Sequence, residues 1–145
     1  MKNGAGSIRL KRVYDSPAAE DGFRVLVERL WPRGITKAEA HLDLWMREIA
    51  PSSDLRKWFA HDPAKWEEFS VRYEKELEKN RELVNMLEQK SRQTTVTLVY
   101  AAHDVRHNSA LVLKRFIENT RTISQKRKKS GESPIDNRPI GIESS

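Results

Sequence analysis

The sequence predicts a single three-layer α/β domain, in which a small, mostly parallel sheet is flanked by helices. Three observations point to this fold. The chain of 145 residues has the length of one domain. Apolar runs typical of strands alternate with amphipathic patterns typical of helices. Finally, the stretch FRVLVERLWPRG passes from a strand pattern into a tight turn, which favours a strand followed by a helix.

Two strands are expected in the N-terminal part of the chain. Residues 8–14 (IRLKRVY) carry apolar side chains on both parities and form a plausible strand. Residues 23–31 (FRVLVERLW) are richer in Val and Leu, which suits a strand that is covered on both faces. Pro32 removes a backbone donor and ends this strand, and Gly34 can adopt the positive φ of a turn.

The next segments are short. Thr36 and Glu39 form the T-x-x-E capping box of a helix. Residues 42–50 (LDLWMREIA) fit either a short strand or a helix, and the pattern slightly favours a strand. Residues 52–60 (SSDLRKWFA) predict a short helix that is capped by serine.

The C-terminal part predicts two longer helices, one strand and a last helix. Residues 61–77 form a clear helix, with Asp62 as its cap and Pro63 in its first turn. A further helical stretch surrounds residues 83–87, and residues 94–102 (TTVTLVYAA) are the second convincing strand. Asp104 or Asn108 caps the last helix. The apolar positions expected to face the core of the helices on either side of this strand are Trp66, Phe69, Tyr73, Leu77, Ala110, Leu113, Phe116 and Ile117.

The charge is concentrated at the two ends of the chain. Of the formal net charge of +6, residues 1–12 contribute four bases and residues 121–145 six bases against three acids, which leaves 17 bases and 18 acids in residues 13–120. We therefore expect a flexible segment 1–7, a domain 8–120 and a disordered basic tail 121–145. A neutral body argues against a DNA-reading domain, while the basic ends leave a nucleic-acid or protein-binding adaptor as an alternative function.

Several classes of protein are excluded by what the sequence lacks. There is no cysteine, so disulfides and thiolate chemistry are absent. Neither a phosphate-binding loop nor a dinucleotide fingerprint occurs, and no cofactor is expected. No apolar run reaches the length of a membrane span and the N-terminal residues lack the apolar core of a signal peptide, so we expect a soluble cytoplasmic protein without a membrane partner. The oligomeric state is not predicted.

The two best strands suggest where a site would lie. Their exits, WPRG and AAHD, meet at one edge of the sheet if the strands are parallel, and ligands collect at that edge in such folds. In the functional interpretation, Arg29 and Arg33 bind a phosphate or a carboxylate. In the structural one, Arg29 pairs with an acid such as Asp104, or Glu28 with an arginine.

The aromatic and capping residues allow two roles each. Trp31 is either a stacking face of the pocket or a plug over the sheet edge, while Trp45, Trp58 and Trp66 are typical of the core. Asp62 is primarily expected as a cap. Asn108 either orients a ligand or closes its cap.

The histidines provide candidates for proton transfer. Asp104 and His107 could form an acid–base pair in which the carboxylate holds the imidazole tautomer, and His61 is a second candidate for exchanging the proton. His103 and His107 could share a helical face, but the spacing is loose and no metal site is expected.

Three motifs carry a resemblance to a known family. GFRVLVERLWPRG, LDLWMREIAPSSDLRKWFAHDPAKWEEFSVRY and VTLVYAAHDVRHNSALVLKRFI closely resemble the YeaO-like family of small bacterial proteins with a DUF488 domain, a domain of unknown function, over residues 8–117. The resemblance implies a small α/β domain without an established activity. His103 stands where the family commonly has lysine, and this chain lacks the cysteines of one branch. The polar and aromatic positions that match the family motif are Arg29, Trp31, Arg33, Trp45, His61, Asp62, Asp104 and Asn108.

The preferred hypothesis from the sequence is a pocket for a small anionic ligand at the edge of the sheet, with hydrolase or transferase chemistry as a further possibility. Arg29, Trp31, Arg33, Asp62, His103 and Asn108 are the candidate ligand-binding residues, and Asp104, His107 and His61 the candidate catalytic ones.

Overall fold

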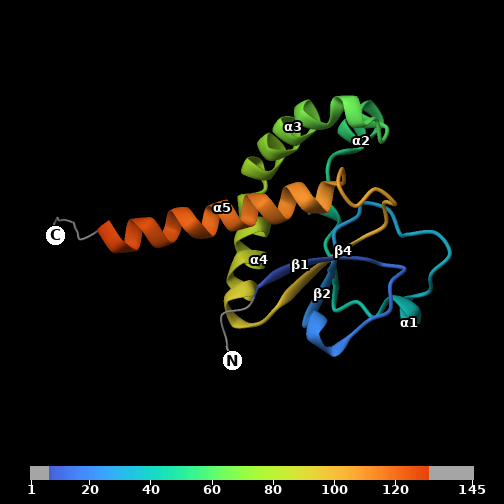
Figure 1. Cartoon of the computed structure of the whole chain (residues 1–145), viewed down its shortest axis with the longest axis horizontal. Coiled ribbons are helices and arrows are strands. Elements are labelled where there is room, and N and C mark those ends of the chain that lie inside the picture. The colour runs from blue at the N-terminus through green and yellow to red at the C-terminus, as the bar shows by residue number, and fades with distance from the viewer. Residues whose placement is uncertain (1–6, 131–145) are drawn as a thin grey trace.

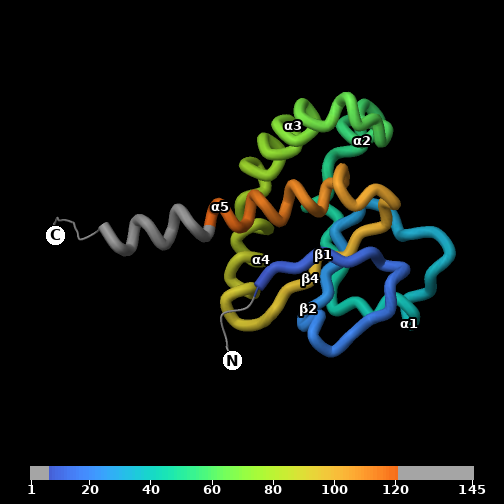
Figure 2. Tube along the Cα trace, in the orientation of Figure 1, coloured from blue at the N-terminus to red at the C-terminus, as the bar shows by residue number. Residues whose placement is uncertain are grey.

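Four parallel strands form the centre of the molecule. The computed structural model of the chain describes residues 7–130, with side chains from residue 7 to residue 120. The strands are β1 (Ile8–Arg12), β2 (Phe23–Leu26), β3 (Leu44–Trp45) and β4 (Val96–Tyr100), in the order β1-β4-β2-β3, and every pair is parallel. The predicted α/β fold with a parallel sheet is therefore confirmed. Because all strands run the same way, their carboxyl ends meet at one edge. Figure 2 shows β1, β4 and β2 side by side.

The strand at residues 23–31 is shorter than predicted. β2 ends at Leu26, and only the Val27 amide continues the ladder, at 3.1 Å from the Val99 carbonyl. Both of its neighbours stop near the same level, since β3 ends at Trp45, opposite Leu26, and β4 ends at Tyr100, one residue beyond the partner of Leu26. The segment 42–50 likewise splits into β3 and a 3-10 turn at Arg47–Ile49.

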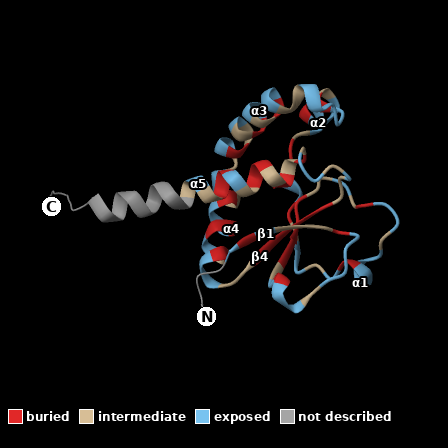
Figure 3. Ribbon diagram, in the orientation of Figure 1, coloured by how far each residue is buried: buried red, intermediate tan, exposed pale blue. Residues whose placement is uncertain are grey.

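One face of the sheet is covered by helices and carries the main core. These helices are α2 (Ser53–Phe59), α3 (Trp66–Lys79), α4 (Arg81–Gln93) and α5 (Ser109–Ser130). Figure 1 shows them on the side of the strands opposite α1 (Lys37–Ala40), and Figure 3 shows the buried residues gathered on the strands and on the inner sides of the helices. The predicted helix stripe Trp66, Phe69, Tyr73 and Leu77 and the α5 residues Ala110, Leu113, Phe116 and Ile117 all belong to this core.

The predicted caps explain where the helices begin. Thr36 Oγ1 accepts a hydrogen bond from the Glu39 amide at 3.1 Å, and Glu39 bonds back to the Thr36 amide at 2.9 Å, which completes the capping box of α1. Ser52 caps α2, and Asp62 caps the 3-10 turn Pro63–Lys65 that leads into α3. These local signals set the register of each helix before any packing contributes.

The second face is thinner, and a buried ion cluster fixes it. It is covered by α1, by the connecting loops and by the 3-10 turn Ala19–Asp21. Arg24, only 4% exposed, donates to Asp21 at 2.7 Å and to the carbonyls of Ala40 and His41 at 2.7 and 2.9 Å, and Lys11 joins Asp21 at 3.0 Å. Burial acts to raise the pKa of Asp21, but hydrogen bonds from a backbone amide and from both cations hold that pKa below its usual value.

The predicted ends of the chain are only partly within the described residues. Helix α5 continues to Ser130, so residues 121–130, assigned from composition to the tail, are helical. Residues 1–6 and 131–145 lie outside the described residues, and so do the side chains of 121–130. Within the part that is described, no helix combines the length and the apolar character needed to cross a membrane.

Two glycines provide a test of this packing. A Cβ at Gly22, where φ is +64°, would lie 2.3 Å from the Thr95 carbonyl oxygen, whereas a Cβ at Gly34, where φ is +76°, meets nothing within 4 Å. Gly34→Ala should therefore cost only the left-handed penalty of about 1–2 kcal/mol. Gly22→Ala should cost that penalty plus roughly 1–3 kcal/mol for the clash, measured by urea unfolding. Equal losses for the two variants would contradict the close approach of Gly22 to Thr95.

Candidate functional site

The exit of β4 holds the carboxyl edge together. The Ala101 amide donates to Glu28 Oε2 at 2.9 Å, and this bond connects the segment after β2 to the exit of β4. From the other side, Arg12 at the end of β1 donates through Nε to the Ala102 carbonyl at 2.9 Å and through Nη2 to the Ala101 carbonyl at 3.4 Å. Since β4 lies between β1 and β2, one dipeptide joins the ends of three strands. The two exits WPRG and AAHD do share an edge, as their parallel strands require.

Glu28 is a partly buried carboxylate with one oxygen engaged. Burial raises its pKa, while the Ala101 amide, Arg56 and His61 act in the opposite direction. Arg56 and His61 influence it through charge, but neither forms an ion pair with it among residues 7–120. Within the same residues Glu28 Oε1 accepts no hydrogen bond. Glu28 Oε1 is therefore a free acceptor near the Arg56 guanidinium.

Tyr100 brings a hydroxyl to the same edge. It is the last residue of β4 and only 4% exposed, yet its hydroxyl makes no hydrogen bond within residues 7–120. Burial raises its pKa, Arg12 lowers it, and Asp15 and Asp104 raise it, so these three charged groups surround the ring. The hydroxyl stays protonated at neutral pH and is a donor without a partner in the described fold.

The predicted pair of Asp104 and His107 is present. His107 Nδ1 lies 2.9 Å from Asp104 Oδ2, and Asp104 Oδ1 accepts from the amides of Arg106 and His107 at 2.9 and 3.1 Å. The hydrogen bond from His107 is the largest cause that holds the pKa of Asp104 below its usual value. The His107 ring meets Trp66 edge-on at 5.3 Å between centroids, which connects this turn to α3.

Asn108 closes the start of α5. Its Oδ1 accepts from the Leu111 amide at 2.9 Å, and its Nδ2 donates to the Asp104 carbonyl at 3.0 Å. Both ends of the side chain are therefore used within the protein, and its geometry fits the capping role. Asp62 is similar, since its Oδ1 accepts from the Ala64 amide at 3.0 Å.

His61 reaches the edge from the end of α2. Both Ala60 and His61 have a left-handed backbone, with φ of 49° and 57°. The His61 ring lies 6.3 Å from the Phe59 ring, and its charge acts on Glu28. His61 is thus grouped with Glu28 and Arg56, separately from the Asp104–His107 pair.

Arg29 makes structural contacts. Its Nε donates to the Pro51 carbonyl at 3.0 Å and its Nη2 to the Ala50 carbonyl at 2.9 Å, which ties the β2 exit to the chain before α2. No ion pair joins Arg29 to Asp104, so that pairing from the structural interpretation was wrong.

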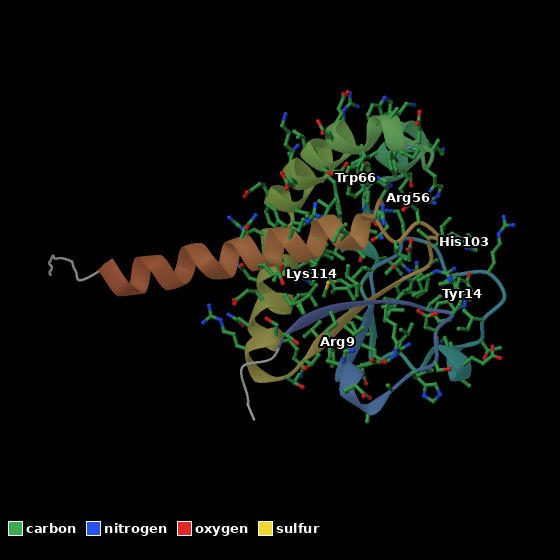
Figure 4. The ribbon with its side chains drawn as sticks, viewed as in Figure 1. Arg9, Tyr14, Arg56, Trp66, His103 and Lys114 are labelled. Carbon is green, nitrogen blue, oxygen red and sulfur yellow. The ribbon has the colours of Figure 1, made fainter. Side chains whose placement is uncertain are left out.

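Arg33 lies at the far side of the WPRG turn. Its side chain is exposed and makes no hydrogen bond or ion pair within residues 7–120, while its carbonyl accepts from the Tyr14 hydroxyl at 2.8 Å. The ring of Tyr14 in turn lies 5.0 Å from the Arg12 guanidinium. His103 is exposed, with Nδ1 at 3.4 Å from Arg12 Nη2, and Figure 4 shows Tyr14, His103 and Arg56 on the same side of the molecule.

Trp31 and Trp45 cover the thinner face of the sheet. Their rings meet edge-on at 5.4 Å, and both pack beside Leu26 and Val99. The Trp31 indole donates to the Ile35 carbonyl at 2.8 Å, and that of Trp45 to the Glu28 carbonyl at 2.6 Å. These contacts fit packing over the sheet edge better than a stacking surface for a ligand.

An open hollow of about 290 Å³ lies beside the β1 exit. It carries the carboxylates of Asp15 and Glu39 and no basic side chain, so it does not suit an anion. Among the residues with described side chains, no group of three His, Cys, Asp or Glu lies close enough to bind a metal ion. The residues around the hollow are Val13, Tyr14, Asp15, Ser16, Pro17, Gly34, Ile35 and Glu39.

Arg12, Arg56 and Tyr100 at this edge were not considered from the sequence, and Glu28 was considered only for a structural ion pair with an arginine. Arg12 and Tyr100 are the last residues of β1 and β4, and a polar group at the carboxyl end of a parallel strand is the signal that could have found them. Tyr100 shares a parity with the buried Val96 and Leu98, so the strand pattern alone does not distinguish it from a core residue.

The fold and the edge define a small parallel α/β domain with a polar cluster where its strands end. Residues 7–135 match the family DUF488-N3i, described as the inactive DUF488-N3 subclade. The chain is 39% identical to the uncharacterized protein YeaO of Escherichia coli K12 over 113 residues, which cover 78% of this chain and 98% of that protein. It is 37% identical to uncharacterized proteins of Mycobacterium tuberculosis H37Rv and Mycobacterium bovis over 110 residues, or 76% of this chain and 92% of each relative.

The chain therefore belongs to the DUF488 family, and the resemblance to its YeaO-like members is confirmed. No solved structure matches it significantly.

The raised pKa of Glu28 predicts a pH dependence of stability. The native state binds this proton more tightly than the unfolded state, so the free energy of unfolding falls as the pH rises above the usual value of 4.5. Glu28→Gln keeps an oxygen for the Ala101 amide but carries no charge. Relative to wild type, it should be equally stable near pH 4 and more stable near pH 7, measured by urea unfolding at about pH 4 and about pH 7. A variant that loses stability at the higher pH would contradict the burial of this carboxylate.

The two arginines near WPRG provide a second comparison. Arg29→Met removes a charged donor from the carbonyls of Ala50 and Pro51 and should cost roughly 2–3 kcal/mol. Arg33→Met removes an exposed side chain and should stay within about 0.5 kcal/mol of wild type. Thermal or urea unfolding measures the stability of both variants. If only Arg33→Met loses stability, Arg33 rather than Arg29 makes the structural contacts, and the assignment is wrong.

Proposed function

We propose that the carboxyl edge of the sheet binds a small anionic ligand that carries a phosphate or carboxylate group, and that it does so without converting it. The observation that carries the proposal is the hydroxyl of Tyr100, a residue that is only 4% exposed, because this hydroxyl makes no hydrogen bond within residues 7–120. A buried polar group without a partner costs about 1–3 kcal/mol, and a ligand oxygen would recover this free energy.

The guanidinium of Arg12 supplies the charge for this site. Its charge acts on the Tyr100 hydroxyl, and it is held in place by the Ala101 and Ala102 carbonyls. Its Nη1 makes no hydrogen bond within residues 7–120 and remains a donor. An oxyanion that accepts from Tyr100 and Arg12 together forms charge-assisted hydrogen bonds without reorganising the protein. Arg12 thus takes the role that Arg29 was expected to have.

Binding without turnover is supported by the family. The matching subclade is described as inactive. Asp104 and His107 form a pair with acid–base chemistry, which keeps hydrolase or transferase activity as the alternative. Release of product from a bound phosphate ester would favour that alternative.

Tyr100→Phe tests the proposal. It removes only the hydroxyl, so the free protein should keep its stability or gain up to about 1 kcal/mol. The affinity for ethyl phosphate and for butyrate, measured by calorimetry, should fall by about tenfold or more, since one hydrogen bond to a charged group is lost.

Tyr73→Phe is the matched control. The Tyr73 hydroxyl donates to the Ile49 carbonyl at 2.6 Å, so this variant should lose stability and keep its affinity. If Tyr100→Phe is destabilised as much as Tyr73→Phe and its affinities are unchanged, the hydroxyl has a structural partner and the proposal is wrong.

A further inference from the structure

A second feature of the edge is the free acceptor of Glu28. The carboxylate is partly buried, and only Oε2 is engaged, by the Ala101 amide at 2.9 Å. A partly buried carboxylate is stable when its remaining lone pairs are satisfied, and within residues 7–120 no group does so for Oε1. This acceptor is chemically the opposite of the donors on Tyr100 and Arg12.

The donors and this acceptor are close enough for one small molecule. Arg12 ends β1 and Glu28 follows β2, and these strands are the two neighbours of β4. Adjacent strands are about 4.8 Å apart, so the two side chains start roughly 10 Å from each other and both turn toward the β4 exit. A ligand with four or five atoms between its two polar groups can contact both.

The charges around Glu28 decide what kind of donor fits. The Arg56 guanidinium already acts on this carboxylate through its charge, without an ion pair within residues 7–120. An ammonium group placed beside Glu28 would meet the repulsion of Arg56 as well as the attraction of the carboxylate. A neutral N–H group donates the hydrogen bond without that repulsion.

Building on the proposed anion site, we propose that the natural ligand is an amide-bearing anion. Its oxyanion binds Tyr100 and Arg12, and its neutral N–H group donates to Glu28 Oε1. Glu28 is then the residue that selects the ligand, because a carboxylate or phosphate ligand without an N–H group donates no hydrogen bond to Glu28 Oε1.

Matched ligands test this directly. Succinamate and levulinate have the same shape, but the terminal amide of succinamate is a methyl ketone in levulinate. Calorimetry with the full-length wild-type protein should give an affinity about tenfold higher for succinamate than for levulinate, and also higher than for 4-aminobutyrate, which carries an ammonium. Glu28→Gln presents an amide that donates as well as accepts, and it should reduce the difference between succinamate and levulinate to less than about twofold.

The outcomes separate the two proposals. If succinamate and levulinate bind wild type equally and Tyr100→Phe weakens both, the anion site stands and the amide preference is wrong. If 4-aminobutyrate binds more tightly than succinamate, the preference of Glu28 for a neutral N–H group over an ammonium is wrong. If none of the three binds wild type, both proposals fail. The comparison of succinamate with levulinate uses the wild-type protein, so it tests the amide preference even if Glu28→Gln does not fold.

Discussion

The structure depends most on how the exit of its central strand is held. A parallel sheet leaves the backbone groups at the carboxyl ends of its strands without partners in the ladder, and β4 has neighbours on both sides. Here side chains from those neighbours supply the partners. Glu28 accepts the Ala101 amide, and Arg12 donates to the two carbonyls that follow. The same contacts that complete the backbone therefore gather a carboxylate and a guanidinium at one edge.

The two layers around the sheet contribute differently to this arrangement. The helices α2 to α5 provide the main core, and α2 also brings Arg56 toward the edge. The thinner face relies on Arg24, which crosses from β2 to the carbonyls that end α1 while it pairs with Asp21. Because Arg24 lies in β2, the position of Glu28 four residues later depends on that buried ion cluster.

The sequence predicted the architecture because its signals are local. Alternating apolar runs identified the strands, and Thr36 and Asp62 were recognised as caps. A serine was expected to cap α2, and Asn108 was one of two candidates, with Asp104, for the cap of α5. The overlong strand at 23–31 shows the limit of this method. Its apolar pattern continues past Leu26, but the neighbouring strands β3 and β4 end at Trp45 and Tyr100, so residues 28–31 have no strand to pair with.

The site was less predictable because residue type does not reveal a partner. The sequence placed WPRG and AAHD at one edge, and found the Asp104–His107 pair. It could not tell that Arg29 would donate to carbonyls rather than to an anion, since both are oxygen acceptors. Nor could it tell that Tyr100 would lack a hydrogen-bond partner, because that depends on the loops that pack around it.

A crystal structure of the wild-type protein with ethyl phosphate is the most direct measurement. We expect the phosphate oxygens within hydrogen-bonding distance of the Tyr100 hydroxyl and of Arg12 Nη1, with the Ala101–Ala102 segment unchanged. A structure in which the Tyr100 hydroxyl is bonded to another group of the protein, while the phosphate lies elsewhere, would contradict the binding site.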